Sequence, residues 1–368
     1  MPAKLKPSIL HDLLKYAVDE RASDLHIREN KNVQLRIDSN LVVIDYETTT
    51  EIFDKICEDI VPKGKYAEFL AKGDLDFAWQ EPDAGRFRVN LHLQRGMRGL
   101  TMRWVKSKAP TVAEAGLPEI LKQIASNNNG IIFITGTTGS GKSTTMAAML
   151  DFINTNFRKH IITIEDPIEY TFEDKMSFFE QREVGLDAES FESALVHALR
   201  QDPDIIVIGE MRNRVTFETA LAAAETGHLV ITTLHTKDAP QSINRILDMF
   251  SIEERDSIRK SLSDVVKAII CQRLAKKASG KGVVPITEIM INAPIVKKLI
   301  FDGRIDRLQQ AIEANEEMGM MTFNQCLLKH YNAGDISEEK ALELSDNPQA
   351  LRMNFKGIFL SDSGGIIQ

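Results

Sequence analysis

Apolar positions in the first hundred residues follow two different periods. Residues Ile9–Ala22 carry apolar side chains at helical spacing, and two further helices are expected at Thr49–Ile60 and Tyr66–Ala71. Six short runs have strand character: Leu25–Arg28, Val33–Ile37, Leu41–Ile44, Asp74–Trp79, Arg86–Leu93 and Gly99–Val105. Their close spacing, with turn residues Asp38-Ser39-Asn40 between two of them, indicates an antiparallel sheet with helices on one face. We therefore expect an α+β domain over residues 1–105.

The pattern changes after a polar stretch, residues 106–118, which contains two prolines and Gly116 and is expected to be a linker. Beyond it, short apolar runs rich in β-branched residues alternate with helical segments, which is typical of a parallel α/β sheet buried on both faces. The expected core strands are Ile131–Thr135, Ile161–Ile164, Ile205–Ile208, Leu229–Thr233 and Val284–Ile289. We expect this α/β domain to span residues 119–292. A helical region with a flexible tail is expected over residues 293–368.

A phosphate-binding loop is the most specific chemical signal in the chain. The segment Gly136-Thr137-Thr138-Gly139-Ser140-Gly141-Lys142-Ser143 matches G-x-x-x-x-G-K-[ST] and lies between a predicted strand and a predicted helix, Ser143–Asn154. In such a loop, successive backbone N–H groups surround the phosphates and the helix N-terminus adds positive potential. Lys142 is expected to reach the β- and γ-phosphates of ATP, Ser143 to ligate Mg²⁺, and Thr144 to complete the nucleotide site.

Carboxylates follow two of the predicted core strands. Glu210 ends the apolar run Ile205–Gly209, which is the Walker-B arrangement that places an acid beside Mg²⁺. Glu165, Asp166 and Glu169 stand on one turn after the strand Ile161–Ile164. One of these three acids is expected to orient or deprotonate the attacking water. A solvated acidic turn is the alternative interpretation.

Two histidines and three arginines are further candidates. His228 precedes the predicted strand Leu229–Thr233 and His235 follows it, so either could sense the γ-phosphate or simply cap the strand. Arg86 and Arg88 lie two apart on one strand and therefore share a face, and Arg103 lies on the next strand. These arginines could deliver charge to a phosphate across an interface. From composition alone, a solvated basic face is the simpler interpretation.

Composition narrows the classes of function. The 368 residues are 43% hydrophobic and 27% charged, as in a globular chain with room for two domains. The formal net charge of −8 argues against nucleic acid as the main partner, because phosphate binding needs a basic face. No apolar run approaches the ~20 residues of a membrane span and no signal-peptide stretch opens the chain, so we expect a cytoplasmic protein without membrane insertion. The three cysteines form no CxxC pair, so neither zinc nor disulfides are expected.

Several segments occur together in an order that is similar to a known family. They are GTTGSGKST, TIEDPIEY, QREVGLD, ALRQDPDIIVIGEMR, AAAETGHLVITTLHT and INRILDMF, with SDLHI and GRFRVN in the first domain. The chain resembles the secretion ATPase superfamily and, within it, the pilus retraction ATPases of the PilT and PilU type. This resemblance extends over nearly the whole chain.

The resemblance implies a PAS-like first domain and a RecA-like second domain, assembled as a ring of six subunits that hydrolyses ATP. Glu169 matches the family's catalytic glutamate and Glu210 its Walker-B glutamate. His228 and His235 match its His box, which raises both above a capping role. The three arginines match first-domain residues that approach the nucleotide phosphates in relatives.

The resemblance implies that the protein powers the retraction of type IV pili, which drives twitching motility. It implies a location at the inner face of the inner membrane and an inner-membrane pilus platform protein as the partner. Extension and type II secretion relatives usually carry an additional N-terminal domain and a tetracysteine motif, so their absence here favours retraction. However, Ala293–Gly303 lacks the Arg-Glu ending of the PilT signature, and residues 334–358 are more similar to PilU. An autonomous motor and an accessory ATPase beside a second, PilT-type ATPase both stay open. A P-loop kinase or nucleotide-gated binding module is a further alternative, although no lid or acceptor site is evident.

Overall fold

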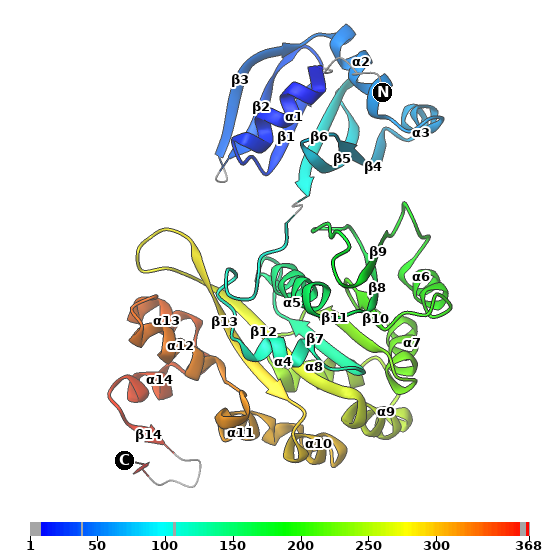
Figure 1. The fold of residues 1–368 in the computed structure, drawn as a ribbon. Helices are drawn as coiled ribbons and strands as arrows, with labels where there is room; N and C mark the ends of the chain where they lie inside the picture. Colours follow the sequence, from blue (N-terminus) through cyan, green and yellow to red (C-terminus); the bar gives the residue numbers. More distant parts are fainter. Residues whose placement is uncertain (1–8, 38–39, 106–107, 361–365, 368) are drawn as a thin grey trace. The chain divides into compact units, whose positions relative to one another are not determined.

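The chain forms two compact units, one built on residues up to Lys108 together with Glu169–Thr171, and the other on Ala109–Ile168 and residues from Phe172 onward. The computed structural model describes residues 9–37, 40–105, 108–360 and 366–367 (Figure 1). The turn residues Asp38 and Ser39, and most of the tail expected to be flexible, lie outside the described residues. The two units are described separately.

In its described residues, the first unit is an antiparallel sheet with three helices. The sheet order is β3-β2-β1-β6-β5-β4, and each neighbouring pair is antiparallel. Side chains such as Phe87 and Val89 are buried together with Leu10 of α1 and Phe53 of α2, so the helices cover one face, as predicted. The strands are β1 (Asp24–Arg28), β2 (Lys31–Ile37), β3 (Asn40–Thr48), β4 (Asp74–Glu81), β5 (Gly85–Gln94) and β6 (Met97–Val105). The helices are α1 (Ile9–Asp19), α2 (Thr50–Ile60) and α3 (Lys65–Lys72).

The second unit is built on a seven-stranded sheet of order β13-β12-β7-β11-β10-β8-β9. Six of its strands run parallel, and the mixed α/β architecture agrees with the prediction. Ile131 and Phe133 of β7 enter one core cluster, while Ile132 and Ile134 enter another, so the sheet is buried on both faces. The strands are β7 (Gly130–Thr135), β8 (His160–Glu165), β9 (Phe178–Glu183), β10 (Ile205–Ile208), β11 (Leu229–Leu234), β12 (Val266–Lys276) and β13 (Val283–Ile291).

Three features of the second unit differ from the expectation. Strands β9 and β12 were not predicted; β12 follows helix α9 directly, with no turn residue to mark its start. Strand β13 is antiparallel to β12 rather than parallel to the core, because the short connection 277–282 makes a hairpin of the two strands. In the polar stretch expected to be a linker, Val112 and Leu117 are buried in a core cluster of the second unit.

Helices pack on both faces of the second sheet (Figure 1). Residues of α4 and α5 share one core cluster, and residues of α6 to α14 share the other. After β13 the described chain is mainly helical, as expected for the C-terminal region. The helices are α4 (Ile120–Ala125), α5 (Lys142–Asn156), α6 (Phe191–Ala198), α7 (Arg214–Glu225), α8 (Ala239–Leu247), α9 (Ile252–Val265), α10 (Pro294–Phe301), α11 (Leu308–Glu313), α12 (Phe323–Asn332), α13 (Glu338–Leu344) and α14 (Pro348–Phe355). Among the described residues, the remaining elements are two short 3₁₀ turns, Ile305–Arg307 and Glu316–Met318, and a strand pair, β14 (Phe359–Leu360) with β15 (Ile366–Ile367).

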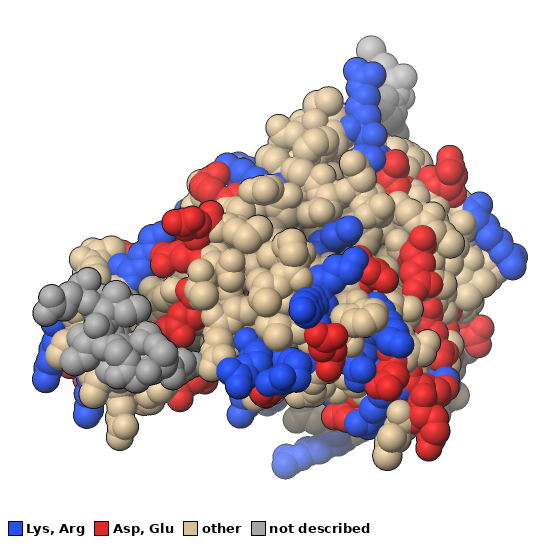
Figure 2. Space-filling view, turned by 90° about the horizontal axis from the view of Figure 1, so that it is seen from below, with Lys and Arg blue, Asp and Glu red and all other residues tan. Residues whose placement is uncertain are grey.

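Charge on the surface is mixed in sign. On the side that Figure 2 shows, lysine and arginine side chains lie among aspartates and glutamates. Among the described residues, no helix combines the length and the apolar composition needed to cross a membrane.

Candidate active site

The predicted phosphate loop connects the buried strand β7 to the N-terminus of α5. Gly136 has φ +145°, and a Cβ atom there would collide with the Gln272 carbonyl oxygen and lie 2.5 Å from Ser140 Oγ. Gly141 is left-handed (φ +91°), and its Cβ would lie 2.6 Å from Gln272 Nε2. Only glycine fits these two positions, so the sequence motif is required by the close approach of β12 as well as by ligand chemistry.

Lys142 and Thr145 fix the start of α5. Lys142 Nζ donates hydrogen bonds to the carbonyl oxygens of Gly136 (2.8 Å) and Thr137 (3.0 Å), which directs the ammonium group over the loop. Thr145 is fully buried, and its hydroxyl donates to Gln272 Oε1 at 2.5 Å. The helix N-terminus is thereby held against β12, with its first N–H groups at the loop.

Glu210 follows β10 at the same carboxyl edge of the sheet. Its carboxylate accepts a hydrogen bond from Arg212 Nε at 2.8 Å and lies 3.2 Å from His235 Nε2. Burial acts to raise the pKa of Glu210, but the hydrogen bond from Arg212 and the charges of Arg212, His235 and Lys142 outweigh it, so the pKa falls below its ordinary value. Glu210 is therefore ionised at neutral pH.

The acids at this edge fit a magnesium ion. Mg²⁺ is held by few protein oxygens together with substrate phosphates and waters, and an ionised carboxylate near the P-loop supplies such an oxygen. Ser143 and Glu210 are the residues that the sequence predicts would hold it, and this assignment stays a prediction. Among the described residues, no group of three or more His, Cys, Asp or Glu side chains forms a metal cluster.

The three acids after β8 have different surroundings. Glu165 is 8% exposed, and its Oε1 accepts hydrogen bonds from Thr163 Oγ1 (2.7 Å) and Gln181 Nε2 (3.2 Å). Asp166 is exposed and lies 4.0 Å from Arg212, the residue that also binds Glu210. Glu169 is exposed further along the same loop. Glu165 thus serves the packing of β8 against β9, while Asp166 and Glu169 present their carboxylates to solvent.

The two histidines lie at opposite edges of the sheet. His235 comes directly after β11 and contacts Glu210, so it belongs to the phosphate edge. His228 comes directly before β11, where its ring Nδ1 lies 2.9 Å from the Ala223 carbonyl and its own carbonyl accepts from Gly130 N. The six residues of β11 lie between the two histidines, so seven steps of ~3.3 Å separate them by roughly 23 Å. The fold does not bring His228 to the phosphate loop of its own chain.

The three arginines share one face of the first unit's sheet. Arg86 and Arg88 flank the buried Phe87 on β5, and Arg88 pairs directly with Arg103 on β6. Arg103 Nε donates to Asp24 Oδ1 at 2.8 Å. Burial acts to raise the pKa of Asp24, but hydrogen bonds from Ser23 and Arg103 lower it overall. The same-face arrangement agrees with the strand spacing, and delivery of charge to a nucleotide stays a prediction.

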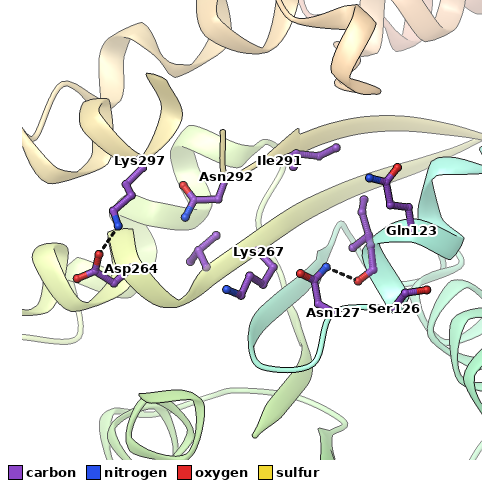
Figure 3. Close-up of a pocket in the computed structure, with 10 residues that line it drawn as sticks. Gln123, Ser126, Asn127, Asp264, Lys267, Ile291, Asn292 and Lys297 are labelled. Atoms are coloured by element: carbon purple, nitrogen blue, oxygen red, sulfur yellow. Dashed lines mark hydrogen bonds and ion pairs between the residues drawn. The ribbon is translucent and has the colours of Figure 1, made fainter. Parts of the chain in front are cut away.

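Among the described residues of the second unit, two hollows can be compared with the predicted site. One, of about 440 Å³, is bordered by P-loop residues 136–140 and by Gln272, Arg273 and Leu274 of β12. The other, of about 560 Å³, lies at the opposite edge of β7 and β12, with Lys267 and Asn292 in its wall (Figure 3). Only the first of these two hollows adjoins predicted site residues.

Two parts of the site were not predicted. Arg212 connects Glu210 to Asp166, and its position two residues after the Walker-B acid was a usable signal. Gln272 contacts both the P-loop backbone and Thr145, but it lies 127 residues away along the chain, on a strand that was itself missed. Nothing local to Gln272 marks that contact.

Comparison with known proteins places this geometry among secretion and pilus ATPases. The family described as type II/IV secretion system protein matches residues 3–293. The type IV pilus retractation ATPase PilT of Pseudomonas aeruginosa is 40% identical over 343 residues, covering 92% of this chain and 98% of that protein. The type IV pilus ATPase PilU of the same organism is 37% identical, covering 94% and 90%. A crystal structure of the pilus retraction motor PilT with bound ADP superimposes with a TM-score of 0.85 at 40% identity, covering 94% of this chain and 98% of that one.

Proposed function

The chain belongs to the type II/IV secretion system protein family, and we propose that it is an ATP hydrolase that powers type IV pilus retraction as a homohexamer. The observation that carries the proposal is the meeting of Lys142, Glu210 and His235 at one edge of the sheet, beside a P-loop. The relatives named PilT and PilU, which match over most of their lengths, supply the pilus context.

Each residue has a distinct part in the proposed reaction. Backbone N–H groups of residues 136–143 and the Lys142 ammonium bind and orient the β- and γ-phosphates, so the chemistry depends on positioning and charge. Ser143 and Glu210 would hold Mg²⁺, which would supply positive charge beside the phosphate oxygens. Glu169 orients the attacking water, and His235, in contact with Glu210, links that edge to the γ-phosphate. The three same-face arginines supply further positive charge from the first domain.

The proposed site is compatible with two roles in pilus retraction, that of an autonomous motor and that of an accessory ATPase. We propose the accessory role as the second candidate. Ala293–Gly303, which contains α10, lacks the Arg-Glu ending of the PilT signature, although the nucleotide site is complete. The hexamer would then act on an inner-membrane pilus platform protein from the cytoplasmic side, beside a PilT-type ATPase. Its own hydrolysis would be intact in either role.

Turnover and assembly test the enzymatic part of the proposal. Purified protein should release phosphate from ATP with Mg²⁺ and elute as a hexamer with nucleotide. Lys142→Ala should abolish turnover, because the phosphates lose a point charge that the loop carbonyls now position. Lys281→Ala, on the exposed β12–β13 connection, is the matched control and should keep turnover. A monomer that transfers phosphate to a small molecule would instead establish a kinase.

The role in retraction is tested in cells. The gene is expressed as the sole retraction ATPase in a piliated strain, and again together with a PilT-type ATPase. Twitching at full speed with this gene alone would refute the accessory role. Loss of twitching alone, with improved twitching beside PilT, is the result expected for an accessory ATPase. No effect in either strain would refute a part in pilus retraction.

A further inference from the structure

The second hollow of this unit, which we call the amino-edge hollow, lies at the edge of the sheet opposite the P-loop. Three segments that are distant in sequence border it: the end of α4 with residues 126–127, the junction of α9 with β12, and the junction of β13 with α10 (Figure 3). The backbone N–H of Asn292 donates to the Lys267 carbonyl at 3.0 Å and ties two of these segments together. The volume of about 560 Å³ lies within the range of small-molecule sites.

Lys267 is placed at this hollow by a local irregularity of β12. Val266 pairs with Ile131 of β7, whereas Ala268 pairs with Ile132, so Lys267 is the additional residue of a β-bulge. A bulge interrupts the regular alternation of a strand and redirects the side chain at that position. The direction of the Lys267 side chain is therefore set by the bulge and not by the ordinary pleat of β12.

Gly130, at the start of β7, allows the Lys267 side chain to lie across the strand. Gly130 has φ +96°, and a Cβ atom there would collide with the Val265 carbonyl oxygen and with Cε of Lys267. Glycine combines this φ with such close neighbours at no steric cost. The aliphatic part of Lys267 is thereby packed against the backbone, and its ammonium group faces the amino-edge hollow (Figure 3).

The Lys267 ammonium has no anionic partner in the wall of the hollow. The residue is half-buried, yet within the described part of the chain its Nζ has neither an ion pair nor a hydrogen bond. The carboxylate of Asp264 pairs instead with Lys297 of α10, at 2.6 Å, so these two charges offset each other at the rim. One positive charge remains in the lining. Because lysine is rarely withdrawn from water without a partner, this charge favours an anionic ligand.

Two amide oxygens in the wall lack a donor. Asn127 Nδ2 donates to the Ile124 carbonyl at 2.7 Å, and Asn292 Nδ2 donates to the Ser263 carbonyl at 2.8 Å. Both amides therefore have a fixed orientation, and among the described residues neither oxygen accepts a hydrogen bond; that of Asn292 is buried. A phosphate dianion would bring further acceptors and a second charge to this wall. A carboxylate that also carries N–H or O–H donors matches it better.

We propose that the amino-edge hollow binds a small amino or hydroxy acid. Its carboxylate pairs with the Lys267 ammonium in a charge-assisted hydrogen bond, and its amino or hydroxyl group donates to the Asn127 amide oxygen. Lys267 and Asn127 are contact residues, whereas Asn292 is a positioning residue that holds the Lys267 backbone. The inference does not depend on the proposed function, because the hollow and the P-loop lie at opposite edges of the sheet.

Four probes test the proposal on the full-length protein, with binding followed by saturation-transfer NMR. L-Glutamine is an amino acid, D-gluconate is a hydroxy acid, D-glucose 6-phosphate carries a phosphate, and D-glucose carries no charge. The unmodified protein should bind glutamine or gluconate about tenfold more tightly than either glucose probe. Lys267→Met keeps the aliphatic stem over Gly130 and should weaken binding of the acid about tenfold, which is ~1.4 kcal/mol. Asn127→Ala should weaken it about fivefold, as for one hydrogen bond.

Lys298→Met is the matched control, because Lys298 is an exposed lysine of α10 that does not border the hollow. It should bind the acid as the unmodified protein does. Lys142→Ala should do so too, which separates this site from the failure or success of the proposed ATPase. If the unmodified protein binds neither acid, or if Lys267→Met binds it equally well, the proposal is overturned, and Lys267 only offsets the negative end of α9. Tighter binding of glucose 6-phosphate than of gluconate would refute the assignment to an acid.

Discussion

Glu288 allows a test of how a buried carboxyl affects the free energy of unfolding, because it has no exposed surface and lies in the middle of β13. Its Oε1 accepts a hydrogen bond from Ala239 N, and its Oε2 accepts one from Gln309 Nε2, each at 2.9 Å. Glu288 thereby joins β13 to the first turn of α8 and to α11. Burial raises its pKa to about 7, and these two hydrogen bonds only partly oppose the rise.

This raised pKa determines whether the folded protein gains or loses stability as pH increases. In the unfolded chain the pKa is the ordinary 4.5, so between pH 4.5 and about 7 the folded protein holds a proton that the unfolded chain has lost. Stability is therefore fully present below about pH 4.5 and is lost as pH rises through about 7. The gap, 7 − 4.5 = 2.5 pH units at ~1.4 kcal/mol each, amounts to roughly 3 kcal/mol above pH 7.

Glu288→Gln removes this titration while keeping the shape of the side chain. The new amide oxygen still accepts from Ala239 N, and the Gln309 amide can turn to accept from the new NH₂ group. At pH 8 the variant should be more stable than the unmodified protein by up to about 3 kcal/mol, and at pH 5 the two should agree within about 1 kcal/mol.

Urea denaturation at pH 5, 6, 7 and 8 measures the difference, with Glu317→Gln as an exposed control that should show no such pH dependence. A difference between Glu288→Gln and the unmodified protein that stays constant from pH 5 to pH 8 would refute the reasoning. So would a variant that is the less stable of the two at pH 8.

Three further substitutions address the site itself. Glu210→Gln should still bind fluorescent ATP but release phosphate at least ~10²-fold more slowly, because it loses the charge that faces the metal; normal turnover would remove Glu210 from the mechanism. His235→Ala should lower turnover, while His228→Ala, at the far edge of the sheet, should change it by no more than about twofold, and the reverse order would contradict the placement of the two rings. Replacing the three same-face arginines of β5 and β6 by alanine should slow ATP hydrolysis by the hexamer ~10³-fold or more, as for arginine fingers; unchanged hydrolysis would return them to a solvated basic face.

The parts of the site that could be predicted are those whose residues follow one another in the sequence. The P-loop, its preceding strand and its following helix occupy residues 130–156 without interruption, so motif and periodicity reinforce each other. Glu210 could be predicted for the same reason, because it ends a contiguous apolar run in the sequence. The histidines needed one more step: a residue after a parallel strand lies at the carboxyl edge and a residue before it lies at the amino edge, which separates His235 from His228.

The parts that were missed depend on contacts across the sheet. Strand β9, with the sequence FFEQRE, mixes aromatic and charged residues because it is an edge strand, and it lacks the continuous apolar run of β7 or β10. Strand β12 begins where α9 ends, so no turn residue separated the two patterns. Local periodicity cannot report that Gln272 meets Thr145, because that contact exists only once β12 has been placed beside β7.

Strand β12 also connects two regions that were predicted separately from the sequence, the nucleotide-binding helix α5 and the C-terminal helices. Successive side chains of a strand point to opposite faces, so Gln272 reaches Thr145 of the nucleotide-binding helix while its neighbour Arg273 reaches Phe323 and Asp346. A shift of α5 relative to β7 must therefore strain contacts that continue through β12 into the C-terminal helices. The structure thus contains a series of contacts from the phosphate loop through β12 to α12 and to the connection between α13 and α14.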